Sequence, residues 1–398
     1  MNKILKFLQY NKIIIWLSNP LKLVLIWLTD FINWCYSPFD LKQSYGLPSQ
    51  NLLQTGGLFA ADLEARFVQP SGEFFYQLPR PTDAGDTALF QGLATGMKIL
   101  RGDDVSKQIA FIKTLFPNNR LIRGYRNDGM INDTTSNDSA SGMLFFLYCA
   151  LFHGDPLTRI EAQKLLVAWV NQLKADNWAL CDQAGNPTQY GQLDAGVLTD
   201  PLRITILLGL LALRMMVVRS PETMSDYTYI YNKYKLILAY PKVKLLWLDT
   251  KYDTHRAAIS LHVLHAVTND ERFKNGLQRI WRITKKENNA WVYTLCYRGL
   301  STNSENGIVN TMLSTFDFAK RQLGNLQSLN DSEPQVKWGS NIRCKYPLPL
   351  NKRGSQDFFW QRDMNSLDEW VGNTTADTYH SGLDFLLAYH LAQQQGLV

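Results

Sequence analysis

The fold is indicated most clearly by one stretch of the chain, DSASGMLFFLYCALFHGDPLTRIEAQKLLVAWVNQLKA, residues 138–175. Its first part, Ser139–Phe152, is small or apolar on every side, which predicts a helix that is buried all round. Its second part, Leu157–Ala175, carries charges on one face at helical spacing, which predicts a helix at the surface. Because only residues 153–156 separate the two helices, we expect them to form a hairpin.

The same alternation of helix types continues along the chain. The small or apolar helices are expected at Thr87–Leu100, Ser139–Phe152, Leu202–Met216, Thr254–Val267, Asn289–Arg298 and Thr378–Ala392. The amphipathic helices are expected at Asp104–Phe116, Leu157–Ala175, Glu222–Ala239, Glu271–Thr284 and Glu305–Leu323, and a helix near Leu52–Phe67 makes twelve. Six buried helices inside six amphipathic ones predict an all-α fold, the (α/α)6 toroid of six helical hairpins, over residues 51–398.

The connections between the expected helices differ in length according to their direction. Those from a buried to an amphipathic helix are short, such as 101–103, 153–156 and 268–270, whereas the return connections are long: 69–85, 117–137, 176–200, 240–253 and 325–376. Long irregular loops in a compact domain usually carry function. We therefore expect a binding cleft at the end of the ring where the inner helices begin.

The composition excludes several classes of protein. With 45% hydrophobic and 19% charged residues among 398, the chain is neither disordered nor collagen-like nor a disulfide scaffold. Its five cysteines include no close pair, and the sequence has no Gly-rich phosphate loop and no nucleophile elbow. No basic, aromatic-interleaved motif resembles a nucleic-acid-binding module. We therefore predict no metal, no cofactor and no nucleic-acid partner.

The first 36 residues form a hydrophobic segment that is expected to associate with a membrane surface. Residues 1–36 contain four lysines against one aspartate, and the stretch Ile13–Tyr36 is largely apolar, with three tryptophans and a break at Pro20. Lysine and tryptophan suit the boundary between water and lipid. Three interpretations stay open: an interfacial anchor, an uncleaved signal-anchor forming a transmembrane helix, and two apolar helices packed on the toroid. Residues 37–50 are expected to be a linker.

The densest polar segment, residues 123–142, enters the core where a buried helix is expected to begin. Asp138, at that helix start, should be ionised because the helix dipole and free N–H groups favour a carboxylate. Asp133, on the preceding loop, is expected in a less polar environment in which it holds a proton. Two carboxylates whose environments separate their pKa values supply an acid and a base. The structural alternative is a capping role for Asp138 and an Asx-turn at Asp133.

Aspartate also occurs where other inner helices are expected to begin. Asp86, Asp253 and Asp377 each precede a threonine at such a position, where an aspartate caps free N–H groups. A histidine follows two of them within three residues, as His255 and His380. A histidine near a helix N-terminus tends to be neutral, and it can then act as a base or donate a hydrogen bond to substrate.

Two segments resemble the six-hairpin glycosidase and polysaccharide-lyase superfamily. The first is DTTSNDSASG (133–142), which feeds an apolar helix ending in HGD (153–155), and the second is TYHSGLDFLLAY (378–389). The resemblance covers residues 50–398, and it implies a sugar-binding funnel at the N-termini of the inner helices.

The loop 325–376 is basic and aromatic, with six basic residues against one aspartate between residues 337 and 362. Aromatic faces stack on sugar rings, and arginine pairs with carboxylate or phosphate groups. Trp338, Arg343 and Trp360 are therefore expected to bind substrate, and the substrate is expected to be an anionic or lipid-linked glycan. The alternatives are a solvated lid whose aromatic residues pack on the toroid and a lid that touches anionic lipid.

These observations favour a carbohydrate-active enzyme that cleaves glycosidic bonds, with hydrolysis ahead of elimination. For a hydrolase, Asp133 is the expected general acid and Asp138 the base or nucleophile, with Asp86, Asp253, Asp377 and His380 binding substrate. For a lyase, Tyr379 or His255 is the expected base, and Arg126 or Asn137 neutralises the uronate. Replacing Asp138 by Asn is expected to abolish turnover and leave folding nearly intact. The alternative function is a non-catalytic, membrane-attached scaffold that binds glycan or protein.

Overall fold

The computed structural model describes residues 52–80, 82, 85–194, 201–235, 252–284, 289–300, 308–313, 335–338, 341–344 and 379–398. The expectations for residues 1–36, for the linker 37–50, for most of the 325–376 loop, and for Trp360 and Asp377 lie outside the described residues. For Asp253, Trp338, Arg343 and His380 the described part is the backbone. Among the described helices, none combines the length and the apolar character that crossing a membrane requires.

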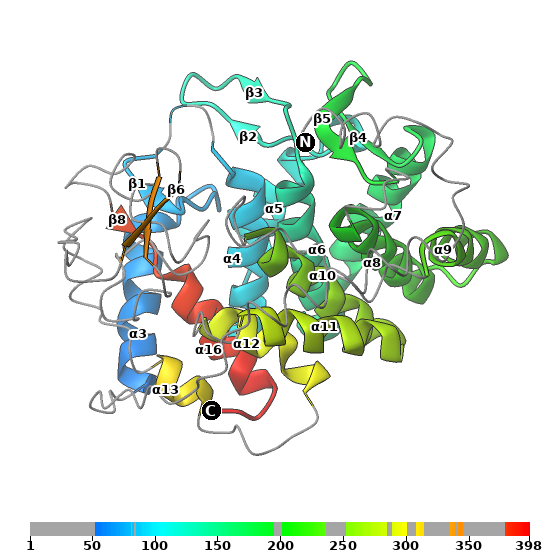
Figure 1. The fold of residues 1–398 in the computed structure, drawn as a ribbon. Coiled ribbons are helices and arrows are strands. Elements are labelled where there is room, and N and C mark those ends of the chain that lie inside the picture. Colours follow the sequence, from blue (N-terminus) through cyan, green and yellow to red (C-terminus); the bar gives the residue numbers. More distant parts are fainter. Residues whose placement is uncertain are drawn as a thin grey trace.

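Six of the described helices form an inner ring (Figure 1). They are α4 (Thr87–Arg101), α6 (Asn137–His153), α8 (Pro201–Val217), α10 (Tyr252–Thr268), α12 (Ala290–Cys296) and α16 (Leu383–Gln394). Each packs against the next in this order, and α16 packs against α4, so that the ring closes. Burial is nearly complete along these helices, from Thr87 to Leu100 in α4 and from Leu383 to Ala392 in α16.

The other described α-helices surround the ring, each packing on at least one of its members. α3 (Leu52–Asp62), extended by the π-helical turn η2 (Leu63–Phe67), packs on α16, and α5 (Ser106–Thr114) packs on α4. In the same way α7 (Pro156–Ala175) packs on α6, α9 (Pro221–Tyr234) on α8, α11 (Glu271–Thr284) on α10 and α13 (Ile308–Leu313) on α12. Six inner and outer pairs in the described residues confirm the predicted all-α (α/α)6 toroid.

Glycine allows α4 and α6 to approach each other closely. A Cβ atom added at Gly142 would lie 2.2 Å from the carbonyl oxygen of Leu89, and one added at Gly92 would lie 2.4 Å from the carbonyl carbon of Gly142. The backbones of the two helices therefore touch, and no side chain fits between them. This contact fixes the N-terminal half of α6, which carries the densest polar segment of the sequence, against α4.

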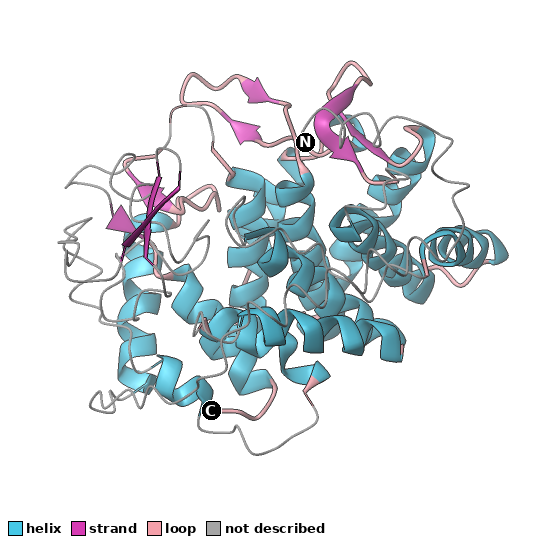
Figure 2. Cartoon of the chain, viewed as in Figure 1, coloured by secondary structure: helices cyan, strands magenta, loops and turns pink. Residues whose placement is uncertain are grey.

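Small β-hairpins lie at the end of the ring where the inner helices begin (Figure 2). We call this end the elaborated end. β2 (Gly124–Tyr125) pairs with β3 (Ile131–Asn132), and β4 (Ala179–Cys181) pairs with β5 (Pro187–Gln192), both antiparallel. Each hairpin belongs to a long connection that leads into an inner helix, α6 or α8. The opposite connections are short, with residues 102–105 joining α4 to α5 and residues 154–155 joining α6 to α7. For these connections the structure confirms the predicted contrast in length, long at the elaborated end and short at the opposite end.

Four further short elements are described. β6 (Gln335–Trp338) and β7 (Asn341–Cys344) form an antiparallel hairpin within the basic and aromatic loop. The 3-10 turns η3 (Pro117–Asn119) and η5 (Tyr297–Gly299) follow α5 and α12.

The predicted start of the last inner helix, at Asp377-Thr378, is wrong. Tyr379 and His380 form strand β8, which pairs with β1 (Gln77–Leu78), and α16 begins only at Leu383. Gly382 stands between strand and helix with a φ of +64°, and a Cβ atom there would lie 2.3 Å from the Phe59 ring. The turn therefore requires glycine. The two expected histidines adopt different structures, since His255 lies inside helix α10 and His380 lies in strand β8.

Candidate active site

The start of α6 is capped by a serine. The hydroxyl of Ser136, which has extended backbone angles, accepts a hydrogen bond from the backbone N–H of Asp138. Asp138 is the second residue of the helix, which begins at Asn137, so the expectation that Asp138 caps the helix is wrong. A serine cap leaves the Asp138 carboxylate available for another partner.

That partner is Arg256, which comes from the start of α10. The Arg256 guanidinium forms an ion pair with Asp138, and the side chains are 6% and 15% exposed. Burial lowers the pKa of Arg256 to about 9, while the negative charge of Asp86 acts in the opposite direction. A guanidinium with this pKa is still charged at neutral pH. The positive end of the α6 dipole and a buried cation therefore both favour the ionised form of Asp138.

A second ion pair lies beside α4. Asp86 precedes α4, yet its side chain makes no capping hydrogen bond, in contrast to the expectation from sequence. Its Oδ1 instead lies 2.6 Å from a guanidinium nitrogen of Arg123, whose Nε donates to the carbonyl oxygen of Gly85 at 2.7 Å. Since the charge of Asp86 also acts on Arg256, the four residues form one group of alternating charges, which we call the charge cluster: Asp86, Arg123, Asp138 and Arg256.

Asp133 lies outside the charge cluster, on the loop between β3 and α6. It is half-buried, and its Oδ2 accepts the backbone N–H of Gln183 at 3.4 Å. The Asx-turn expected at Asp133 is instead made by Asn132, whose Oδ1 accepts from both the backbone N–H and the hydroxyl of Thr134. The side chain of Asp133 thus faces the β4–β5 segment, and no cation pairs with it among the described residues.

The β4–β5 hairpin holds this loop in place. The hydroxyl of Thr188 in β5 donates to the carbonyl oxygen of Thr135 at 2.7 Å. The Arg120 guanidinium donates two hydrogen bonds to the Asp176 carboxylate, both with N···O distances of 2.9 Å, and these hydrogen bonds lower the pKa of Asp176. The long connection 117–137 and the described part of the next one, residues 176–194, are therefore held together by these contacts beside the start of α6.

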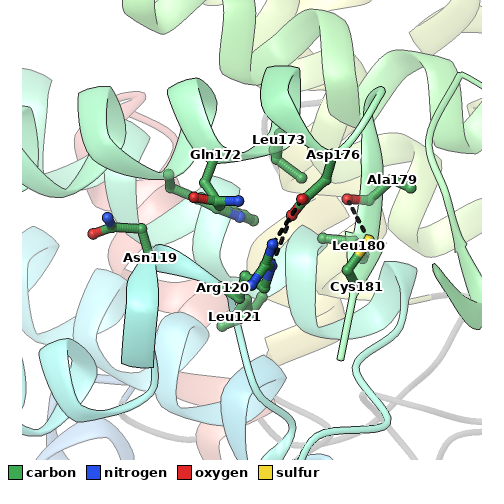
Figure 3. A pocket seen from close by; sticks show the side chains of 10 residues that line it. Asn119, Arg120, Leu121, Gln172, Leu173, Asp176, Ala179, Leu180 and Cys181 are labelled. Carbon is green, nitrogen blue, oxygen red and sulfur yellow. Dashed lines mark hydrogen bonds and ion pairs between the residues drawn. The ribbon is translucent and has the colours of Figure 1, made fainter. Parts of the chain in front are cut away.

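The Arg120–Asp176 pair lines a pocket between α7 and β4 (Figure 3). Its empty space, open solvent included, is about 170 Å³. Binding sites for small molecules usually span about 300–1,000 Å³. This pocket is therefore a packing gap at the rim and lies apart from the charge cluster.

The remaining predicted site residues are placed as follows. Asn137 is buried in the first turn of α6, and its carbonyl oxygen accepts the Ser141 hydroxyl. His255 is fully buried beside Arg256 in α10. Arg126 is exposed on the β2–β3 hairpin and pairs with Asp128, while the Tyr379 ring lies under the Arg66 guanidinium. Within the described part of the chain, no ion pair or hydrogen bond links Arg126 or Tyr379 to the charge cluster.

Sequence reasoning missed the two arginines of the charge cluster. Arg256 is followed by the small and apolar residues Ala257, Ala258 and Ile259, and an arginine at the start of a buried helix indicates a carboxylate partner. That signal indicates a buried ion pair for Arg256, but it does not say which aspartate is the partner. Arg123 has no comparable signal, because it lies on a loop.

Within the described residues, no three His, Cys, Asp or Glu side chains gather closely enough to hold a metal ion. No protein-family profile matches the chain, and no curated protein matches it in sequence.

Two solved structures from Bacteroides thetaiotaomicron are similar to the chain. One is a family 76 glycoside hydrolase, a mannosidase, with a TM-score of 0.47 and 9% identity over 87% of this chain and 100% of that one. The other is a family 76 alpha-mannanase, with a TM-score of 0.45 and 8% identity over 86% of this chain and 95% of that one.

Proposed function

We propose that the protein is a glycoside hydrolase whose active site lies at the elaborated end of the ring. The observation that carries the proposal is the pair of unlike carboxylates at the start of α6. Asp138 is ion-paired with buried Arg256, whereas among the described residues the Asp133 side chain accepts one long hydrogen bond, from the backbone N–H of Gln183. Two carboxylates in such different environments are suited to opposite roles in acid–base catalysis.

In this mechanism Asp138 acts as the base or nucleophile. A carboxylate that is stabilised as an anion does not donate a proton at neutral pH, but it can accept one from water or attack the anomeric carbon. Asp133, which has no cationic partner among the described residues, then protonates the glycosidic oxygen of the leaving sugar. Asp86 and Arg123 border the same site and would hydrogen-bond sugar hydroxyl groups.

Elimination by a lyase receives less support from the same geometry. A lyase base must reach the proton next to the uronate, yet His255 is fully buried. Tyr379 lies against Arg66 from η2, at 5.2 Å from guanidinium carbon to ring centre. Hydrolysis is therefore the reaction that the described residues favour.

We also propose that the substrate is an anionic or lipid-linked glycan and that residues 1–36 hold the protein at a membrane surface. The support for the first is the excess of basic and aromatic residues between 337 and 362. The support for the second is the lysine- and tryptophan-rich apolar sequence of residues 1–36.

The proposal is tested with a panel of acidic and neutral polysaccharides, α-mannan included, and with lipid-linked oligosaccharides. New reducing ends and the ultraviolet absorbance of unsaturated products are followed together. Reducing ends without absorbance are the expected result. Absorbance would identify a lyase, and binding without cleavage of any substrate would identify a glycan-binding scaffold.

A further inference from the structure

An exposed tyrosine lies on the β4–β5 hairpin, close to the loop that carries Asp133. Tyr190 in β5 is 54% exposed. Thr188, two residues earlier in the same strand, donates its hydroxyl to the carbonyl oxygen of Thr135 at 2.7 Å. Since two residues of extended chain span at most about 7 Å, Tyr190 lies at the rim of the loop that leads from Asp133 into α6.

The backbone around Tyr190 is fixed by the strand next to it. A Cβ atom added at Gly191 would lie 2.2 Å from the carbonyl oxygen of Leu180, so the backbone at Gly191 is in close contact with β4. The Thr188 hydroxyl also lies 3.2 Å from that carbonyl oxygen. A tyrosine ring that is exposed on a fixed backbone offers contact area to a ligand at a low cost in conformational entropy.

The side chains beside Tyr190 are polar and uncharged. Gln189 and Gln192 are both exposed, and residues 183–193 contain no Asp, Glu, Lys or Arg. Glutamine amides donate and accept hydrogen bonds, which suits sugar hydroxyl groups, whereas a carboxylate or phosphate group is best bound by arginine. The chemistry of the hairpin therefore fits a neutral sugar unit, with its ring face on Tyr190 and its hydroxyl groups near the two amides.

The neighbouring β2–β3 hairpin also exposes apolar side chains. Met130 is 62% exposed and Ile131 is 42% exposed, and Ile131 stands two residues before Asp133. Figure 1 shows the β2–β3 and β4–β5 hairpins at the same end of the ring. Asp133 follows β3 directly, and its carboxylate accepts the backbone N–H of Gln183 from the β4–β5 hairpin. Single exposed apolar residues are common on protein surfaces, but here three of them border one loop.

We propose that Tyr190 is the stacking platform of a subsite that binds a neutral sugar unit of the glycan, beside the bond that is cleaved at Asp133. The inference rests on the proposed function for the position of that bond, and it adds the kind of sugar unit that is bound next to it. A sugar unit held on Tyr190 orients the chain along the loop from Asp133 to α6. The anionic or lipid-linked part of the proposed substrate then lies elsewhere along the glycan.

The test uses the full chain on native gels that contain α-mannan, dextran, pullulan or polygalacturonate, in which bound protein is retarded. At least one of the three neutral polysaccharides is expected to retard the wild type. Tyr190→Ala is expected to bind that polysaccharide about tenfold more weakly, because one aromatic contact is lost. Tyr190→Trp keeps an aromatic face and is expected to bind within about twofold of the wild type.

A matched control is available in the same chain. Tyr229 on α9 is 61% exposed, and Tyr229→Ala is expected to bind as the wild type does. Positions 190 and 229 are both exposed, so circular dichroism should show unchanged folding for all variants.

Three results would overturn the inference. The first is a wild type that none of the neutral polysaccharides retards, and the second is a Tyr190→Ala variant that binds as the wild type does. The third is a Tyr190→Trp variant as weak as Tyr190→Ala, since the contact would then depend on the hydroxyl group and not on the ring face.

Release of reducing ends is measured separately, so that the two proposals fail in different ways. A wild type that binds through Tyr190 and cleaves nothing supports the subsite and refutes the hydrolase. A wild type that cleaves a polysaccharide and binds it equally well without Tyr190 supports the hydrolase and refutes the subsite.

Discussion

Replacing Asp138 by Asn is expected to cost stability as well as activity. The substitution removes the carboxylate that neutralises Arg256, which is 6% exposed, and leaves a buried guanidinium without its ion-pair partner in α6. Breaking a buried pair by removing one member costs about 3–5 kcal/mol. Asp86 lies close enough to act on Arg256 and offsets part of this loss, so we expect a cost of about 3 kcal/mol.

The structure thus revises the expectation that folding would stay nearly intact. The revision matters for the functional test, because a partly unfolded variant loses turnover through unfolding, whether or not Asp138 takes part in the reaction. Stability must therefore be measured first, and activity must be assayed at a temperature at which the variant is folded.

A double-mutant cycle measures the pair directly. The free energy of unfolding is determined by urea titration for the wild type, Asp138→Asn, Arg256→Met and the variant with both changes. Because the double variant buries neither charge, it should be more stable than the sum of the two single losses predicts, by about 2–3 kcal/mol. Strictly additive losses would refute the argument that these two side chains hold each other in the folded protein.

Further predictions concern acid stability, helix packing and the loop fastening. Burial lowers the pKa of His262 to about 3, so this residue stabilises the neutral-pH fold and that stability is lost as the pH falls from the unfolded value of 6.5. At pH 4.5 the loss is about 3 kcal/mol. His262→Asn keeps a donor for the carbonyl oxygen of Leu295 but cannot titrate, so its urea-unfolding free energy should vary less with pH; parallel curves for variant and wild type would contradict this. Gly142→Ala should destabilise by about 1–3 kcal/mol or more, since α4 and α6 must separate, and an unchanged melting temperature would show that they have room. Arg120→Gln should speed limited proteolysis of the 117–137 and 176–200 connections, with Lys164→Gln on α7 as an exposed control that leaves the cleavage rate unchanged.

The ring of helices was predictable because the pattern of apolar and polar residues along each helix indicates which of its faces are buried. A helix such as Ser139–Phe152 can be apolar on every side only if other helices surround it, and an alternating partner such as Leu157–Ala175 shows where the surface lies. The boundary at α16 escaped this reasoning, because the strand β8 is defined by pairing with β1, three hundred residues earlier in the chain. Pairing of that kind depends on the tertiary structure.

The candidate site was predictable in part. Asp138 lies at the expected end of the ring. The sequence did not show that Ser136, two residues earlier, caps the helix in place of Asp138, because serine and aspartate are equally good caps. Likewise Asn132 makes the turn that was expected of Asp133. Neighbouring Asn, Asp and Ser side chains compete for the same backbone N–H groups, and the sequence alone does not rank them. The pairing of Asp138 with Arg256 joins two helices and required the structure.

Asp138 is proposed to carry out glycoside hydrolysis at the elaborated end. This proposal is tested most directly by comparing the turnover of Asp138→Asn with that of Asp155→Asn on a polysaccharide that the wild type cleaves. Asp155 caps α7 at the opposite end of the ring, where it accepts hydrogen bonds from Leu157 and Thr158, so its replacement costs stability without touching the site. We predict that Asp138→Asn lowers kcat about a thousandfold or more while folded and that Asp155→Asn keeps the wild-type rate. Equal turnover by the two folded variants, or a wild type that releases no reducing ends from any acidic, neutral or lipid-linked glycan, would contradict the account.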